Sequence, residues 1–387
     1  MKKKPRKQMG PETIVPIGDW FPDEIVGNIL QKLPDKSLMR FLCVSKKWCS
    51  MISDPKLIMN TQKLLLVYPA SMKVMEYNAY RGNTRKVKFG PLLNSRQPFE
   101  VWGSSNGLLL IAVYLSWSLY IWNPVTGESK KLPHLENNLY SSFGFGYDHS
   151  TDDYKIVNLR QYMGGDIYSM RRNSWRSVGD IPCSGADIDV YRKGGILANN
   201  ALHWHVIYKG TSLQTIEGSC IICLNGDIDN SGRTAHLAIF RFDLVEEAGM
   251  LILPSHEADN ESEYELMDFK GCLCAIQNQN GSSIEMWILR GKNTLLSWMK
   301  LMTIPGLEQV PEMKFLAPIY FSRNGEILLN IRPDSIVHRR LQYPRKRRTT
   351  IFYSYNPKEK TFKRVRVRGI RSWTSEITYG ENLVSLN

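Results

Sequence analysis

Residues 104–133 read SSNGLLLIAVYLSWSLYIWNPVTGESKKLP, and this stretch decides the fold of most of the chain. Its Asn106-Gly107 pair is typical of a tight hairpin turn, and a wholly apolar run follows from Leu108 to Tyr114. A bilayer-spanning helix needs about 20 mostly apolar residues. The uncharged segment 101–127 is long enough, but Ser116 and Ser118 interrupt it and Asn123-Pro124 ends it. Its valine, isoleucine, tyrosine and tryptophan residues favour strands. We therefore predict a buried β-hairpin rather than a membrane segment.

Looser copies of this unit recur after Leu64. Each combines an apolar strand, a strand with alternating aromatic residues and a strand that ends near a proline. The prolines at 133, 182, 254 and 305 are 49, 72 and 51 residues apart, and a period near 50 indicates a kelch-like β-propeller. Residues 64–387 leave room for about six blades. The longest interval contains the polar segment 225–233, which we interpret as a loop insertion. A pair of β-sandwiches is the alternative architecture.

The segment 21–58 differs from the rest because its apolar residues follow a helical period. Ile25, Ile29 and Leu33 are four residues apart, and Val26 and Leu30 form a parallel stripe. This pattern predicts a helix with one apolar face.

Prolines bound this predicted helix. Pro22 suits the first helical position, and the acidic pair that follows it complements the positive end of the helix dipole. Pro34 ends the helix because it pushes the preceding residue out of the α region. Asp35 and Ser45 are suited to cap two further short helices, which carry Leu38, Phe41, Leu42, Trp48 and Ile52. Three such helices cannot bury all their apolar side chains among themselves, so we expect a partner protein to cover them.

This segment resembles an F-box, in which a proline and an acidic pair precede patterns such as Leu-Pro-Asp-Lys-Ser-Leu and Val-Ser-Lys-Lys-Trp. The matching residues are Pro22, Asp23, Glu24, Ile29, Leu30, Leu33, Pro34, Lys36, Ser37, Leu38, Phe41, Val44, Ser45, Lys47 and Trp48. Trp20-Phe21 departs from the leucine that is more usual there. The resemblance implies docking on the Skp-type adaptor of a cullin–RING ubiquitin ligase. We expect the interface or its shape to depend on Pro22, Ile25, Ile29, Leu33, Pro34, Leu38, Phe41, Val44 and Trp48. The alternative is a three-helix cap packed on the body of the chain.

The body resembles the F-box-associated interaction domain of plant F-box proteins. The residues that carry this resemblance are IWNPVTG (121–127), FGFGYD (143–148), DYKIV (153–157), NSWR (173–176), LHW (202–204) and FDL (242–244). His205 departs from the family pattern, which has an apolar residue there. The resemblance implies a substrate-binding domain and a plant origin. We therefore expect an α+β multidomain chain with a basic flexible arm (1–18), a short three-helix F-box (19–60) and an all-β, kelch-like β-propeller of about six blades (64–387).

Basic residues are concentrated in two places in a chain whose formal net charge is +13. Residues 1–8 carry five positive charges, and residues 339–371 carry 13 against a single glutamate, so the remainder is slightly acidic. Arginines alternate with valines in the last strand, so they should line one exposed face. We predict that this surface helps to bind an acidic protein substrate, through Arg345, Lys346, Arg347, Arg348, Arg364, Arg366 and Arg368. Solvated charge and nuclear-import signals are the alternatives, and we expect the protein in nucleus and cytoplasm.

No motif for bond-making chemistry is found in the sequence. It contains no Gly-x-Ser-x-Gly elbow, His-Glu-x-x-His, P-loop or dinucleotide fingerprint. Cys220-x-x-Cys223 and Cys272-x-Cys274 resemble zinc-ligand pairs, but both lie in apolar runs, where cysteine behaves as a small hydrophobe. His203 and His205 share one strand face, and we expect a structural or rim role for them. We predict no catalytic residue, metal or cofactor.

Together these features predict a substrate receptor, which holds a substrate lysine near the thioester of a ubiquitin-conjugating enzyme. Cullin and RING subunits would then be indirect partners, and neither membrane nor nucleic acid is expected. Three other classes stay open. They are a ligase-independent propeller scaffold, a nucleic-acid-binding protein whose affinity falls steeply with salt, and a propeller enzyme that copurifies with a metal.

Overall fold

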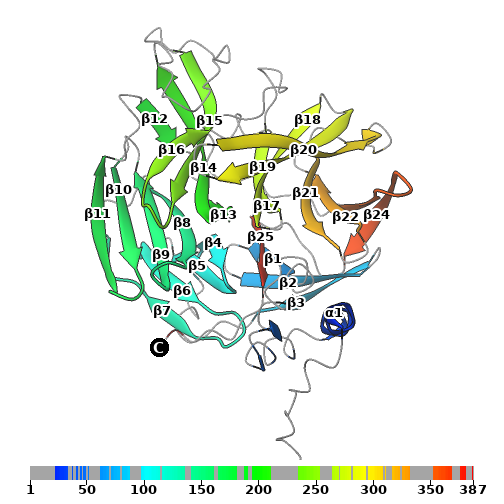
Figure 1. Ribbon diagram of the computed structural model, residues 1–387, viewed down its shortest axis with the longest axis horizontal. Helices are drawn as coiled ribbons and strands as arrows, with labels where there is room; N and C mark the ends of the chain where they lie inside the picture. The colour runs from blue at the N-terminus through cyan, green and yellow to red at the C-terminus, as the bar shows by residue number, and fades with distance from the viewer. Residues whose placement is uncertain are drawn as a thin grey trace, which may run out of the picture. The chain divides into compact units, whose positions relative to one another are not determined.

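The computed structural model describes residues 22–33, 37, 41, 44–45, 47–48, 51, 62–68, 71–78, 81–87, 97–113, 116–135, 141–160, 164–180, 187–190, 194–210, 234–252, 264–269, 271–279, 282–292, 295–307, 310, 316–322, 325–331, 352–367, 375–380 and 386. The chain divides into two compact units, Met1–Asn60 and Thr61–Asn387. The first unit contains helix α1 (Asp23–Lys32). The second contains strands β1 to β25, which form the six blades of a β-propeller (Figure 1). The prediction of about six blades is confirmed.

The blades are antiparallel sheets that follow one another along the chain, except that the last strand joins the first blade. Blade 1 has the order β25-β1-β2-β3, and blade 4 carries a fifth strand, β13, beside β14. Blade 1 consists of β1 (Gln62–Tyr68), β2 (Ser71–Asn78), β3 (Arg81–Lys86) and β25 (Ser375–Gly380). Blade 2 consists of β4 (Phe99–Ser105), β5 (Leu108–Val113), β6 (Ser118–Trp122) and β7 (Ser129–Lys131). Blade 3 consists of β8 (Ser141–Asp148), β9 (Asp153–Arg160), β10 (Gly164–Ser169) and β11 (Ser174–Asp180).

The second half of the ring repeats this plan. Blade 4 consists of β12 (Asp187–Val190), β13 (Ile196–Ala198), β14 (Ala201–Gly210), β15 (Thr234–Asp243) and β16 (Gly249–Ile252). Blade 5 consists of β17 (Tyr264–Phe269), β18 (Cys272–Gln279), β19 (Ser283–Lys292) and β20 (Leu295–Pro305). Blade 6 consists of β21 (Leu316–Phe321), β22 (Ile327–Ile331), β23 (Phe352–Asn356) and β24 (Thr361–Val367). The predicted insertion at 225–233 falls between β14 and β15 and lies outside the described residues.

The hydrophobic core of the propeller lies between blades. Strand β5 shows why its sequence is apolar throughout. Leu109 and Ile111 face blade 1, whereas Leu108 and Leu110 face blade 3, so alternate residues enter two different cores. Similar clusters join each blade to the next, and the last of them packs Leu64 and Leu66 of β1 against Phe352 and Val365 of blade 6. The six blades therefore form a closed ring.

The hairpin predicted from residues 104–133 is confirmed in blade 2. Asn106 and Gly107 connect β4 to β5 with φ angles of 45° and 82°, the positive values that a type I′ turn requires. Strands β5 and β6 pair antiparallel, and all six residues of β5 are buried. Among the described residues, no helix is long and apolar enough to cross a bilayer.

A recurring turn explains part of the sequence repeat. In blade 2 the Asn123 side chain accepts hydrogen bonds from the backbone N–H groups of residues 125 and 126, at 2.8 and 3.3 Å. Asp243 in blade 4 and Asn356 in blade 6 make the same pair of bonds at the end of the third long strand. Such side chains hold a tight turn by replacing a backbone acceptor. The asparagine or aspartate in each copy is therefore set by turn geometry.

The glycines of FGFG (143–146) allow neighbouring blades to approach closely. The Gly195 N–H group donates to the Phe143 carbonyl at 2.8 Å, and Gly144 forms a bridge to the same residue. A Cβ atom on Gly195 or Gly144 would lie 2.5 Å from the indole of Trp204, closer than a carbon contact permits. Blades 3 and 4 therefore meet where a side chain has no room.

The ring is closed by its C-terminal strand. Strand β25 pairs with β1 from Gln62↔Gly380 to Val67↔Ser375, so residues from the two ends of the propeller share one sheet (Figure 1). Tyr379 is buried in the core between blades 1 and 2. The Ser104 hydroxyl of β4 donates to the Thr378 carbonyl at 3.0 Å. The first blade is therefore complete only when the end of the chain has been added.

Candidate protein-docking surfaces

Helix α1 is the first candidate surface, and its ends are set by two prolines. Pro22 is the N-cap residue, with φ −54° and ψ 143°, so its predicted placement at the first helical position was wrong by one residue. A cap residue keeps an extended conformation that proline adopts readily. At the other end Leu33 is extended, with φ −80° and ψ 148°, as expected for a residue that precedes proline.

The two parallel apolar stripes expected on this helix differ in burial. Val26 and Leu30 are 4% and 0% exposed and form the small core of this unit. Ile25 and Ile29 are 46% and 48% exposed. Since residues 25 and 29 are one turn apart, they form a row beside the buried one. Among the described residues, Leu33, Phe41, Trp48 and Met51 pack against the buried row.

Residues 41–51 supply the partners of the buried row. Phe41 and Trp48 pack edge to face with ring centroids 5.3 Å apart, and both lie against the Val26–Leu30 core. The Trp48 N–H group donates to the Ser45 hydroxyl at 3.1 Å, which confirms the predicted cap at Ser45. Lys47 pairs with Asp23 at 2.6 Å, but both side chains are well exposed, so this ion pair contributes little. Aromatic packing therefore holds the unit together.

The residues predicted to dock an adaptor divide into two groups. Pro22, Ile25, Ile29 and Val44 are exposed, whereas Leu33, Phe41 and Trp48 are half-buried and support the core. Pro34 and Leu38 lie outside the described residues. Three of the six large hydrophobic side chains that are exposed in the described part of the chain belong to this unit, although it ends at Asn60. Unburied apolar surface of this kind makes this unit a candidate protein-binding site.

The second candidate surface is the basic strand β24. Arg364 and Arg366 are exposed and Val365 is 3% exposed, so the expected alternation is observed at these positions. The other predicted residues of this surface, Arg345, Lys346, Arg347, Arg348 and Arg368, lie outside the described residues. Neighbouring blade 1 also contributes cations, which the sequence reasoning missed because they are about 280 residues away in the chain.

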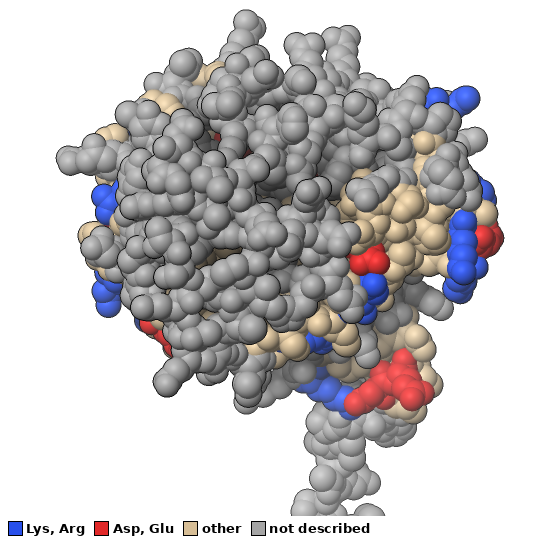
Figure 2. All heavy atoms as spheres, turned by 90° about the horizontal axis from the view of Figure 1, so that it is seen from above, with Lys and Arg blue, Asp and Glu red and all other residues tan. Residues whose placement is uncertain are grey.

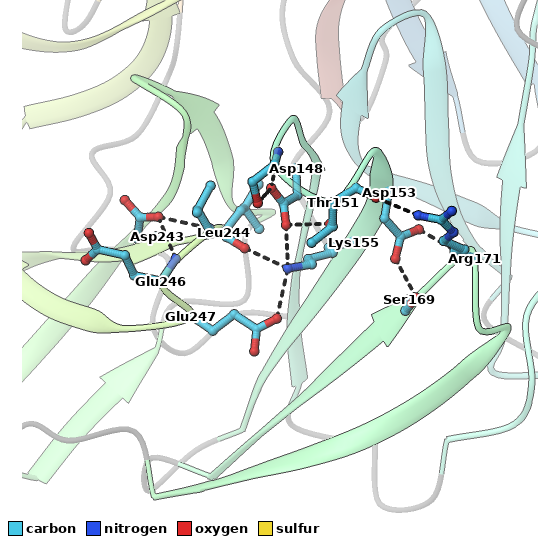
Figure 3. A network of polar contacts seen from close by, with 12 residues as sticks. Asp148, Thr151, Asp153, Lys155, Ser169, Arg171, Asp243, Leu244, Glu246 and Glu247 are labelled. Carbon is cyan, nitrogen blue, oxygen red and sulfur yellow. Dashed lines mark hydrogen bonds and ion pairs between the residues drawn. The ribbon is translucent and has the colours of Figure 1, made fainter.

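A buried polar cluster joins blades 3 and 4 and resembles a reactive site (Figure 3). The Lys155 ammonium lies 2.7 Å from Asp148, 2.9 Å from Glu247 and 2.8 Å from the Leu244 carbonyl. Arg176 pairs with the other oxygen of Glu247. Lys155 and Asp148 are almost fully buried, and every polar group of the lysine is satisfied. The cluster therefore links blades 3 and 4 through ion pairs and a hydrogen bond.

The charge of Asp148 is stabilised by its neighbours. Burial alone would raise the pKa of this carboxyl, but hydrogen bonds from Lys155, Ser150 and Thr151 outweigh burial and hold the pKa below its usual value. These contacts give the FGFGYD, DYKIV and FDL patterns a physical reason. The first two patterns supply Asp148 and Lys155 on the β8–β9 hairpin of blade 3, and FDL supplies the Leu244 carbonyl, which reaches Lys155 only when blade 4 packs against blade 3.

We expect the substitution Lys155→Met to lower the free energy of unfolding by about 3 kcal/mol, because it leaves Asp148 and Glu247 without their buried cation. In the parent protein, stability should fall as the pH drops below about 4, because the unfolded chain then takes up a proton at this aspartate while folded Asp148, whose pKa is lowered, stays ionised. This acid dependence should shrink in the variant. Urea unfolding followed by tryptophan fluorescence at several pH values measures both effects.

Lys300→Met is the matched control, because Lys300 makes an ion pair of the same 2.9 Å length with Glu285 but is 40% exposed. Its loss should cost about 1 kcal/mol or less. Equal effects of the two substitutions would contradict a stabilising role for the buried cluster.

His203, His205 and Cys274 are buried side chains. His203 donates from Nδ1 to the Ile196 carbonyl at 3.3 Å, and burial together with the nearby Arg241 lowers its pKa to about 3. His205 accepts the Leu266 N–H group at 3.2 Å and lies against Tyr264, which joins blades 4 and 5. Burial raises the pKa of Cys274 to about 12. Among the described residues, no group of three or more His, Cys, Asp or Glu is placed to hold a metal, and Cys220 and Cys223 lie outside them.

The fold and the surfaces define a propeller protein with a separate helical docking unit. The sequence matches the F-box domain family over residues 19–60 and the F-box associated beta propeller domain family over residues 65–386. The chain therefore belongs to the F-box proteins that carry an F-box-associated β-propeller domain. Proteins of this class act in general as non-catalytic substrate adaptors of SCF ubiquitin ligases.

Relatives in Arabidopsis thaliana share this organisation. An F-box/kelch-repeat protein is 27% identical over 84% of this chain and 90% of its own length. The F-box protein CPR1 is 25% identical over 82% of this chain and 81% of its own length. A chain in the solved nidogen–laminin complex shares 9% identity with a TM-score of 0.45, over 83% of this chain and 99% of that one, which is too distant to bear on function.

Proposed function

We propose that this protein is the substrate-recognition subunit of an SCF-type cullin–RING ubiquitin ligase. Its F-box docks on a Skp-type adaptor, and its propeller presents a bound protein substrate for ubiquitination. The observation that carries the proposal is the exposed pair Ile25 and Ile29 beside a buried pair on the same helix. A helix that stabilised only its own chain would gain more by burying both rows.

This role requires the receptor to position a bound substrate, not to react with it. A substrate lysine reacts with a thioester that belongs to the ubiquitin-conjugating enzyme, so the receptor raises the local concentration of that lysine and makes no covalent bond itself. A rigid carrier serves this purpose well. The closed ring of six interblade cores, with β25 paired to β1, supplies such a carrier.

Co-elution with a purified Skp-type adaptor tests the proposal. We expect the full-length chain and the adaptor to form a one-to-one complex in size-exclusion chromatography, and a chain that lacks residues 1–60 to elute alone. Adding cullin and RING subunits should then yield ubiquitination of proteins captured by the propeller. A full-length chain that is folded but elutes apart from the adaptor at ~10 µM would favour a ligase-independent scaffold.

A further inference from the structure

We propose that an extended, acidic segment of the protein substrate binds along a basic ribbon at the seam between blades 6 and 1. The inference rests on the proposed function for the nature of the partner, a protein. The basic ribbon consists of described residues on the β23–β24 hairpin and on strand β3, namely Lys358, Lys360, Lys363, Arg364, Arg366, Arg85 and Lys86. The first and last strands of this ribbon belong to opposite ends of the propeller sequence.

The seam is a parallel strand pair. Strand β24 pairs with β3 at Arg366↔Arg81 and Val367↔Gly82, and this joins blades 6 and 1 into one eight-stranded sheet. Because the two strands run in the same direction, β3 continues along the line on which β24 ends. At about 3.3 Å per residue, the path from Arg364 to Arg85 is roughly 20 Å. Arg364, Arg366 and Arg85 are separated by even numbers of residues along this path, so they follow one another on one side of it, whereas Lys363 and Lys86 fall on the other side.

Exposed cations are concentrated along this path. All seven residues of the basic ribbon are exposed, and Glu359 is the one carboxylate on the described part of the β23–β24 hairpin. Glu359 lies 4.0 Å from Lys363, with both side chains at least half exposed, so it neutralises little of the charge. Figure 2 shows blue side chains gathered at the right edge of the view, the side on which β24 lies in Figure 1. Like charges so close together repel one another, and a bound anion would relieve that repulsion.

Among the residues that the structure describes, Arg85, Arg364 and Arg366 have no carboxylate partner. Val365 is the residue of β24 that is buried in the core between blades 6 and 1. The arginines therefore remain available to a ligand, and guanidinium groups pair well with carboxylates because they can donate two parallel hydrogen bonds.

The geometry favours an extended acidic peptide over nucleic acid. Arg364 and Arg366 lie on the same side of β24, about 6.6 Å apart along the strand, which is the repeat of alternate residues in an extended chain. Sites for single-stranded nucleic acid combine cations with exposed aromatic rings that stack on bases. Here the nearby rings of Tyr355 and Phe362 pack on one another at 4.9 Å in the core between blades 5 and 6. They are not free to act as stacking platforms.

The test uses the full-length protein in complex with its Skp-type adaptor. The probe is a fluorescein-labelled peptide of about twelve residues with glutamate at alternate positions, and its reference has glutamine there. Anisotropy titration should show binding of the acidic probe alone, weakened between ~50 and ~200 mM salt. We expect each of the variants Arg364→Glu/Arg366→Glu and Arg85→Glu/Lys86→Glu to weaken that binding about fivefold or more.

Lys131→Glu/Arg172→Glu is the matched control, because both residues are exposed and lie on blades 2 and 3. This variant should bind the acidic probe within about twofold of the parent. An equal loss in this control would show a general charge effect and overturn the inference. So would failure of the parent protein to bind the acidic probe, or retained binding by both ribbon variants.

Two further outcomes separate this inference from others. If a single-stranded oligonucleotide of matched charge binds more tightly than the peptide and is released by the ribbon variants, the partner is nucleic acid and the inference is wrong. Co-elution with the adaptor is measured on the same samples. If the adaptor complex forms but does not bind the acidic probe, binding of an acidic segment to the basic ribbon is contradicted and the proposed function is not. If no adaptor complex forms, the proposed function is contradicted.

Discussion

Replacing Ile25 and Ile29 together with aspartate is expected to abolish co-elution with the adaptor and leave the fold intact. Both side chains are about half exposed and lie outside the Val26–Leu30 core, so their replacement should disturb that core little. Truncating an interface anchor can cost about 2 kcal/mol, and two such losses amount to about a thousandfold in affinity. The introduced carboxylates would also have to be desolvated in the complex, which adds to the cost. Calorimetric titration with the purified adaptor measures the effect.

Val245→Asp/Met299→Asp is the matched control for this experiment. These residues are 52% and 48% exposed, close to the values for the two isoleucines, but they lie on the propeller. The control should bind the adaptor normally. Leu30→Ala provides the contrast, because it removes a fully buried side chain and should destabilise the helical unit by about 3 kcal/mol. Adaptor binding by the Ile25→Asp/Ile29→Asp protein at parental affinity would rule out α1 as the docking helix.

Ending the chain at residue 374 is expected to prevent the propeller from folding. The truncation removes β25, which pairs with β1 over six residues and brings Tyr379 into the core between blades 1 and 2. Without it, the buried residues Leu65 and Val67 would lie beside an unpaired strand edge. Exposed edges of this kind lead to aggregation. Soluble yield, far-ultraviolet circular dichroism and the urea midpoint of any recovered protein measure the outcome.

A point variant keeps this prediction testable if the truncated chain cannot be recovered. Tyr379→Ala should lower the free energy of unfolding by about 3 kcal/mol, because it leaves a cavity in a packed core. Removing residues 2–8 serves as the control and should not change the urea midpoint. A soluble chain ending at residue 374 with a parental midpoint would show that β25 does not close the ring.

Local sequence patterns predicted much of the fold. The Asn106-Gly107 turn and the apolar run of β5 were foreseen because turn preference and strand alternation act over a few residues. The position of α1 was foreseen to within a residue at its start, since helix periodicity and proline sterics are equally local. Spacing between prolines near blade ends gave the number of blades.

The difference in burial between the two apolar stripes of α1 was not foreseen. Ile25, Ile29, Val26 and Leu30 are all apolar, so hydropathy assigned them to one face. In the described part of the unit, Phe41 and Trp48 pack against Val26 and Leu30, and the two isoleucines stay exposed. Which of two neighbouring apolar stripes is buried depends on what packs against it, and this is a property of the tertiary structure.

The sequence by itself determined a helical docking unit followed by six repeated sheets, because periodicity, turn residues and prolines act on neighbours in the chain. Only the tertiary structure decided that β25 completes blade 1, that Lys155 bonds blade 3 to blade 4, and that β24 and β3 align their cations. Each of these contacts joins residues about 90 to 310 positions apart. No local pattern encodes such a pairing, because it follows from closing the ring.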